Sequence, residues 1–168
     1  MSHSFDIVTE SPVSVEQIHA AFGREDYWQA RLADGVGTTL DLLRVDDDGA
    51  VNVSITQHLG RQVLPGVVAK VVPADLKLRY RETWRPVGDG SMRGVAEASA
   101  SGGLGSSRAE NWLAPSGGAS QLRSAVRVDV KIPLMGRQLE KAIGSSLADS
   151  IPAVLRFTTT WIERTCMS

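Results

Sequence analysis

The last third of the chain, Pro133 to Arg164, reads PLMGRQLEKAIGSSLADSIPAVLRFTTTWIER. Apolar residues recur in it at steps of three and four, a spacing that places them on one face of a helix. These residues are Met135, Leu139, Ile143, Leu147, Ile151, Val154 or Leu155, and Trp161 or Ile162. Charged residues fall mostly on the other side, at Arg137, Glu140, Lys141, Asp149, Arg156 and Glu163. The pattern predicts one long amphipathic helix, whose apolar stripe needs a partner surface of similar length.

Pro152 lies inside this predicted helix. A proline in a helix interior removes one backbone hydrogen bond and clashes with the preceding turn, at about 3 kcal/mol if the clash is unrelieved. We therefore expect a kink near Ser150, or alternatively two helices that meet there.

The chain before this helix is dominated by patterns typical of strands. Residues 2–10 alternate as a strand does, and Ser14 with Gln17 resembles a capping box that begins a short helix ending at Gly23. A second short helix is expected from Arg24 to Ala33. Further strands, separated by turns, are expected at 38–45, 50–58, 76–86, 92–101, 104–113 and 119–132. The stretch 59–75 is compatible with a short strand, a helical segment or an irregular one.

These elements predict an α+β domain in which a curved antiparallel sheet wraps around the long C-terminal helix, with two short helices after the first strand. No repeat, low-complexity tract or linker divides the chain, so we expect residues 1–168 to form a single domain.

Composition narrows the possible functions. The 18 basic and 19 acidic side chains leave a formal net charge of −1, which favours neither nucleic acid nor anionic lipid as a partner. No apolar run approaches the ~20 residues of a membrane helix, and no secretory signal is visible. The single cysteine, Cys166, has no internal partner, and His3, His19 and His58 are far apart in sequence. We therefore predict a cytoplasmic protein without an integral membrane segment, metal or cofactor.

The junction Val130-Lys131-Ile132-Pro133-Leu134-Met135-Gly136-Arg137-Gln138-Leu139-Glu140 resembles that of the START-like, helix-grip (SRPBCC, polyketide cyclase-like) superfamily. The junction is similar to that of an actinobacterial subgroup of unknown function in this superfamily, and so is the closing Thr160-Trp161-Ile162. The resemblance covers nearly the whole chain. It implies a cavity between sheet and helix that typically holds lipids, sterols or polyketides, but it supplies no catalytic residues.

Glu82 is the best candidate for a functional polar residue. Alternation along strand 76–86 places it on the apolar side, between Tyr80 and Trp84. A carboxylate in such a place could act as a general acid or base, or could bind the polar end of a ligand. We favour a plainer alternative, in which a bulge shifts the alternation or an arginine such as Arg108 pairs with Glu82.

The candidate ligand-binding residues share an expected position on the inner side of the sheet or helix. They are Tyr80, Glu82, Trp84, Trp112, Met135, Leu139, Ile143 and Leu147. For each of the apolar residues, ordinary core packing is the competing interpretation. The basic side of strand 76–86, with Lys77, Arg79, Arg81 and Arg85, is interpreted as a solvated outer face rather than an anion site.

Three functions remain open at this point. We favour a non-catalytic protein that binds a small apolar or amphipathic ligand between sheet and helix. The second is an enzyme of the cyclase or hydrolase kind that uses polar residues, Glu82 first, in the same cavity. The third is a protein-interaction module without a ligand, for which a filled interior and a homodimer would be expected.

Overall fold

The computed structural model describes residues 2–35, 37–59 and 76–165. The elements in chain order are β1 (Ser2–Ser11), α1 (Val15–Phe22), α2 (Glu25–Leu32), β2 (Thr38–Val45), β3 (Val51–Leu59), β4 (Leu76–Pro86), β5 (Met92–Ala100), the 3₁₀ turn η2 (Ser101–Gly103), β6 (Gly105–Ser116), β7 (Ala119–Val130) and α4 (Gly136–Thr165). Of the stretch 59–75, whose structure the sequence left open, Leu59 is the last residue of β3 and residues 60–75 lie outside the described residues.

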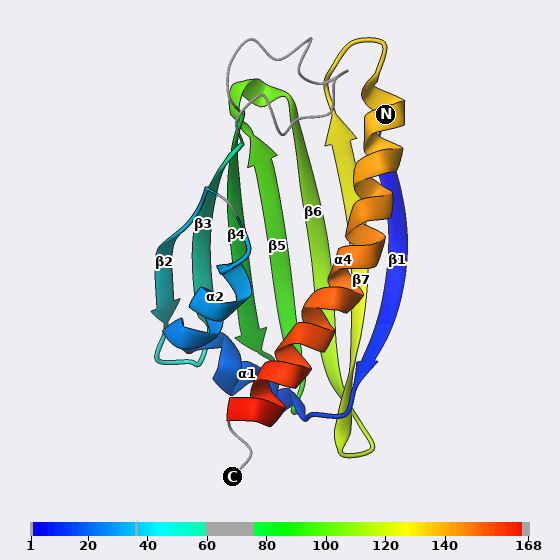
Figure 1. The fold of residues 1–168 in the computed structure, drawn as a ribbon. Coiled ribbons are helices and arrows are strands. Elements are labelled where there is room, and N and C mark those ends of the chain that lie inside the picture. The colour runs from blue at the N-terminus through cyan, green and yellow to red at the C-terminus, as the bar shows by residue number, and fades with distance from the viewer. Residues whose placement is uncertain (1, 36, 60–75, 166–168) are drawn as a thin grey trace.

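The seven strands form one antiparallel sheet in the order β1-β7-β6-β5-β4-β3-β2. Neighbours in the chain are neighbours in the sheet from β2 to β7, and β1 pairs with β7 along its whole length. Figure 1 shows that α1, α2 and α4 all lie on one face of this curved sheet. The predicted fold class, a sheet wrapped around a long C-terminal helix with two short helices after the first strand, is confirmed.

Local sequence signals account for the short helices. The Ser14 side chain accepts the backbone N–H of Gln17 at 3.2 Å, and the Gln17 side chain accepts the backbone N–H of Ser14 at 2.9 Å. This capping box satisfies donors that the first turn of α1 would otherwise leave without partners. Tyr27 and Trp28 of α2 are fully buried.

α4 is continuous from Gly136 to Thr165 and has Pro152 inside it. The alternative of two helices meeting near Ser150 is therefore wrong, whereas the expected kink stays a prediction. The helix also begins three residues later than the sequence suggested, because Leu134 has a left-handed backbone with φ of 70° and residues 133–135 form a turn.

The inward face of α4 differs from the predicted stripe in the first half of the helix. Glu140, predicted on the polar side, is 3% exposed, and Ile143, predicted on the apolar side, is 40% exposed. The cause is the way the helix packs on β1 and β7. Gly144 lies so close to β1 that an added Cβ would be 2.5 Å from Cδ2 of His3, and Glu140 Oε2 accepts the backbone N–H of Val130 at 2.9 Å.

The second half of α4 follows the predicted pattern more closely. Leu155 and Ile162 belong to the buried core, with Ile151 and Trp161 packed against it. Thr158 bonds to Tyr27 of α2, and Thr159 bonds to Ser11 at the end of β1, both at 2.6 Å. The core is therefore densest where α1, α2 and the C-terminal half of α4 meet the sheet. Among the described residues, no helix is long and apolar enough to cross a membrane.

We expect Glu140→Ala to lower the free energy of unfolding by about 1–3 kcal/mol, because it leaves the Val130 N–H without its acceptor. Glu140→Gln keeps an acceptor oxygen and should recover most of that loss. The exposed neighbour Lys141 provides the control Lys141→Ala. Chemical denaturation measures all three, and equal losses for Glu140→Ala and Lys141→Ala would contradict the assigned role.

Candidate functional site: a cavity between sheet and helices

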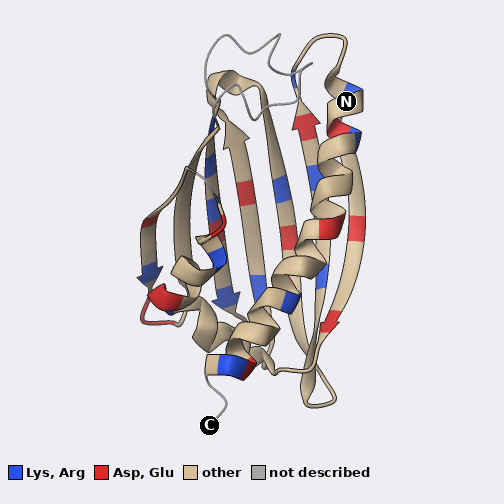
Figure 2. Ribbon diagram, viewed as in Figure 1, with Lys and Arg blue, Asp and Glu red and all other residues tan. Residues whose placement is uncertain are grey.

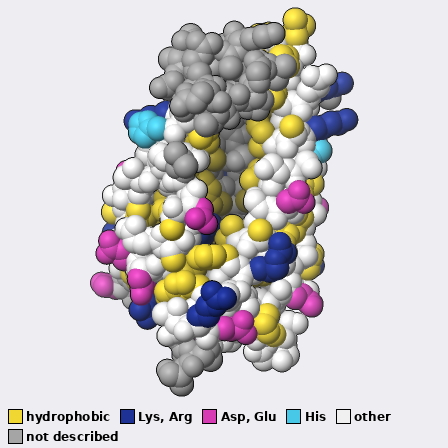
Figure 3. Space-filling model, viewed as in Figure 1, with side chains coloured by type: hydrophobic (Ala, Val, Ile, Leu, Met, Phe, Trp, Pro, Cys, Tyr) yellow, Lys and Arg dark blue, Asp and Glu magenta, His cyan; other side chains and the backbone are white. Residues whose placement is uncertain are grey.

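A cavity of about 410 Å³ lies between the inner face of the sheet and the helices. Figure 3 shows the surface hollowed between α2 and α4. Apolar side chains of all the surrounding layers line this space. They include Ile18 and Phe22 of α1, Leu32 of α2, Ile55 of β3, Leu78 of β4, Leu113 of β6, Leu122 and Val126 of β7, and Leu147, Ile151, Val154 and Leu155 of α4.

The space exists because the middle of the sheet carries small inward side chains. Ala96 and Ala98 of β5 pair with Ala109 and Ser107 of β6, and all four line the cavity. The long helix does not fill the gap, since its N-terminal half packs on β1 and β7 at one side of the sheet. Small residues on the sheet, together with a helix that lies to one side of them, therefore leave a void.

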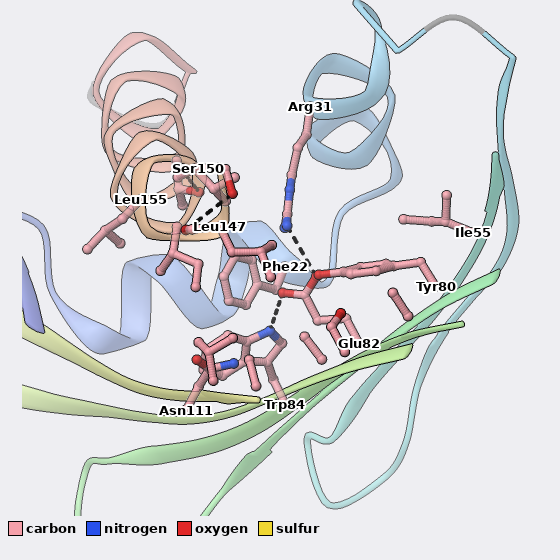
Figure 4. Close-up of a pocket in the computed structure, with 18 of the residues that line it drawn as sticks. Phe22, Arg31, Ile55, Tyr80, Glu82, Trp84, Asn111, Leu147, Ser150 and Leu155 are labelled. Carbon is pink, nitrogen blue, oxygen red and sulfur yellow. Dashed lines mark hydrogen bonds and ion pairs between the residues drawn. The ribbon is translucent and has the colours of Figure 1, made fainter. Parts of the chain in front are cut away.

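Glu82 lies on the cavity wall and is 4% exposed. Its Oε2 accepts from Tyr80 Oη at 2.9 Å and from Arg31 Nη2 at 3.2 Å, and its Oε1 accepts from Trp84 Nε1 at 2.8 Å. Figure 4 shows these side chains converging from α2 and β4. The carboxylate thus has a partner for each oxygen and a cation beside it, as a buried charge requires.

The arginine of this cluster is held on its other side by an aromatic ring. The Arg31 guanidinium lies 4.5 Å from the ring centroid of Trp28, a cation–π geometry. Its Nη1 is buried and has no hydrogen-bond partner among the described residues. Arg31 and Trp28 both belong to α2, so the Arg31–Glu82 pair attaches this short helix to the sheet.

Burial, followed by the charge of Glu82, raises the pKa of the Tyr80 phenol well above its usual value of 10.0. Burial likewise raises the pKa of Tyr27, with Arg31 acting in the opposite direction. Both phenols therefore stay protonated near neutral pH. Tyr80 acts as a hydrogen-bond donor to Glu82, which it does only in the protonated form.

Of the two plainer expectations for Glu82, the bulge is wrong, and the pairing with an arginine is right except for the arginine named. The β3–β4 and β4–β5 registers run without a bulge, so alternation keeps Glu82 inward. Its partner is Arg31 rather than Arg108, whose side chain is 50% exposed and pairs with Glu97 and Glu110. The inward position was deduced correctly, whereas the partner came from a helix far away in the chain.

The structure brings together only some of the predicted site residues. Tyr80, Glu82, Trp84 and Leu147 line the cavity. Trp112 lies on the opposite face of the sheet, because it alternates with Asn111 and Leu113, which do line the cavity.

Three predicted residues of the long helix also lie away from the cavity lining: Met135, Leu139 and Ile143. The reason is again the rotation of the first half of α4 toward β1 and β7, which directs Glu140 and Gly144 at the sheet. The first residue of the predicted stripe that reaches the cavity is Leu147.

Several polar residues of the cavity escaped the sequence argument, among them Arg31 and Asn111. Arg31 follows Tyr27 by four positions, so it shares the inward face of α2. Asn111 could have been found by alternation from Leu113 in the same strand. The large apolar side chain of Trp112 favoured the opposite alternation, with Trp112 facing inward. Only the tertiary structure shows that this tryptophan faces outward.

A family model described as "Protein of unknown function (DUF2505)" matches residues 6–162. The chain belongs to this family. Uncharacterised proteins of Mycobacterium tuberculosis and Mycobacterium bovis are similar to it, at 36% identity over 174 residues that cover 96% of this chain and 98% of each relative. These relatives are therefore similar to the chain over nearly its whole length.

Solved structures with little sequence similarity share the fold. The ZhuI aromatase/cyclase from Streptomyces sp. R1128 has a TM-score of 0.63 at 8% identity, over 100% of this chain and 98% of that one. Human STARD10 has a TM-score of 0.59 at 11% identity, over 98% of this chain and 64% of that one. A START superfamily protein from Mycobacterium smegmatis has a TM-score of 0.51 at 12% identity, over 92% and 97%. The fold of this DUF2505 member is START-like, as the resemblance implied.

We expect Glu82→Leu to lower the free energy of unfolding by about 3 kcal/mol, because it leaves Arg31 buried without its partner charge. Arg31→Met should also destabilise, and the double variant should lose less than the sum of the two, by about 0.5–3 kcal/mol. Denaturation of the four proteins completes this cycle. In the exposed pair of Glu97 and Arg108, Glu97→Leu serves as the control and should change stability by at most about 1 kcal/mol. Additive losses at Arg31 and Glu82 would contradict the coupling.

The chain contains two tyrosines, and the pKa of each is raised in the folded state. A folded-state pKa above the unfolded value stabilises the fold fully below the unfolded pKa, near 10, and this contribution is lost as pH rises beyond it. We therefore expect near-ultraviolet absorbance to show no tyrosinate in the folded protein at pH values where the urea-unfolded chain has ionised both. Ionisation of either tyrosine near pH 10 with the circular dichroism unchanged would contradict this.

Proposed function

We propose that this protein binds a small apolar or amphipathic molecule in the cavity between the sheet and α4, without transforming it. The observation that carries the proposal is an open apolar cavity with a buried, hydrogen-bonded polar cluster on its wall. Its volume of about 410 Å³ falls within the range of about 300–1,000 Å³ that is usual for small-molecule sites. Affinity would come mainly from apolar surface removed from water, at about 25 cal/mol per Å².

The nature of the cluster favours binding over catalysis. All three contacts of Glu82 are with donors, and two of them, Tyr80 and Trp84, are fixed on the same strand. A carboxylate used in this way orients its neighbours rather than collecting a substrate proton. No histidine, cysteine or aspartate is present among the described residues that line the cavity, so an acid–base mechanism would rest on Glu82 and Tyr80 alone.

Fold similarity is compatible with the proposal without selecting the ligand. The START-like neighbours include a protein named as an aromatase/cyclase and one named as a START superfamily protein. One fold hosts several activities, so the cavity residues carry the argument here. A lipid, a sterol and a polyketide are all ligands of the proposed class. A module that acts only through protein contacts has less support, since the interior retains a cavity.

We expect the protein, purified from its own host, to retain a ligand detectable by native mass spectrometry, and the stripped protein to bind the fluorescent probe 1-anilinonaphthalene-8-sulfonate. Ala109→Leu fills the centre of the cavity floor and should weaken probe binding about tenfold or more. Ala114→Leu, on the outward face of the same strand β6, is the matched control and should bind like the wild type.

The proposal fails if Ala109→Leu binds the probe as the wild type does while its melting temperature shows that it is folded. It also fails if no host molecule is retained and no lipid, sterol or polyketide raises the melting temperature of the stripped protein.

A further inference from the structure

Asn111 is a polar residue at the closed end of the cavity. It is 7% exposed, and the cavity residues Leu113, Leu122 and Leu155 are each 8% exposed or less. Residues toward the other end, such as Gln57 and Ser150, are half-buried or exposed. The amide of Asn111 therefore meets a part of the cavity whose neighbouring side chains are shielded from bulk water.

The orientation of this amide follows from its one hydrogen bond. Ser124 Oγ donates to Asn111 Oδ1 at 2.6 Å, and Ser124 is 0% exposed. A reversed amide would leave the buried Ser124 hydroxyl proton without an acceptor. With Oδ1 bound to Ser124, the other end of the amide is Nδ2, which carries two N–H donors. This Nδ2 group has no hydrogen-bond partner among the described residues.

Nothing in the Glu82 cluster supplies an acceptor to Asn111. Gly94 lies between Trp84 and Asn111 in the sheet register, and the Trp84 indole covers it. A Cβ built on Gly94 would be 2.6 Å from Trp84 Cε3. Figure 4 shows Asn111 beside the indole, at a distance from Arg31. Asn111 is thus a polar point separate from the Glu82 cluster, at an end of the cavity that is also lined by Leu113, Leu122 and Leu155.

We propose that the ligand presents a neutral carbonyl-type oxygen, such as that of a ketone, quinone or ester, to Asn111 Nδ2 at the closed end of the cavity. This inference rests on the proposed function and specifies its ligand class. A neutral acceptor satisfies the amide donor without bringing a charge into an apolar environment. A carboxylate would arrive there without a free cation among the described lining residues, because the Arg31 charge is paired with Glu82. Arg108, the other arginine of that lining, pairs with Glu97 and Glu110.

The test uses a matched pair of tricyclic probes, 9-fluorenone and fluorene, which differ by one carbonyl oxygen, with fluorene-9-carboxylate as the charged comparison. Calorimetry on the full chain should show fluorenone binding about tenfold more tightly than fluorene, which corresponds to about 1.4 kcal/mol. The carboxylate should bind more weakly than fluorene. In Asn111→Leu, which has similar volume and no donor, the preference for fluorenone should disappear while fluorene binds as before or better.

A second measurement needs no variant and covers the case in which Asn111→Leu does not fold. The infrared carbonyl stretch of fluorenone bound to the wild type should lie at lower frequency than in hexane, as a hydrogen bond requires. Equal binding of both probes, a preference that survives in Asn111→Leu, or an unshifted carbonyl band would each overturn this inference while leaving the cavity function intact. Failure of fluorene itself to bind would instead count against the proposed function, because fluorene needs only apolar space.

Discussion

The buried carboxylate of Glu82 is the constraint on which the site depends. A charge on the inner face of a sheet is tolerated only with partners, and here they come from Tyr80 and Trp84 of β4 and from Arg31 of α2. The ion pair connects a short helix to the middle of the sheet, and Trp28 holds the guanidinium from the other side. The three contacts of this one carboxylate thus position α2, hold the side chains of Tyr80 and Trp84, and give the cavity its polar wall.

The cavity itself depends on where the long helix lies. A helix packed along the middle of the sheet would cover the alanines of β5 and β6. α4 instead packs on β1 and β7 in its first half, where Gly144 allows close approach, and reaches α1 and α2 only in its second half. Figure 2 shows charged residues on both α2 and β4, the two elements that the ion pair joins. A diagonal helix over small residues leaves space that a central helix would have filled.

The polar residues of the cavity have different roles despite their similar burial. Glu82 is occupied by three donors, whereas the Nδ2 group of Asn111 has a donor to offer. The first cluster organises the protein, and the second is the one we assign to a ligand. This division explains why the carboxylate, the best candidate in the sequence, is less suited to act on a ligand than an amide that the sequence argument passed over.

The sequence by itself determined the elements of this protein and the face on which β4 carries Glu82. Alternation, capping residues and turns are local signals, and the apolar stripe required a sheet for the helix to cover. The tertiary structure alone decided that Arg31 pairs with Glu82, that Trp112 faces outward while Asn111 faces inward, and that α4 turns Glu140 rather than Ile143 toward the sheet. These outcomes depend on which distant surfaces meet and how closely the backbones approach. A pattern of three- and four-residue steps leaves both open. It identifies the apolar side of a helix, but not which residues along that side contact the sheet.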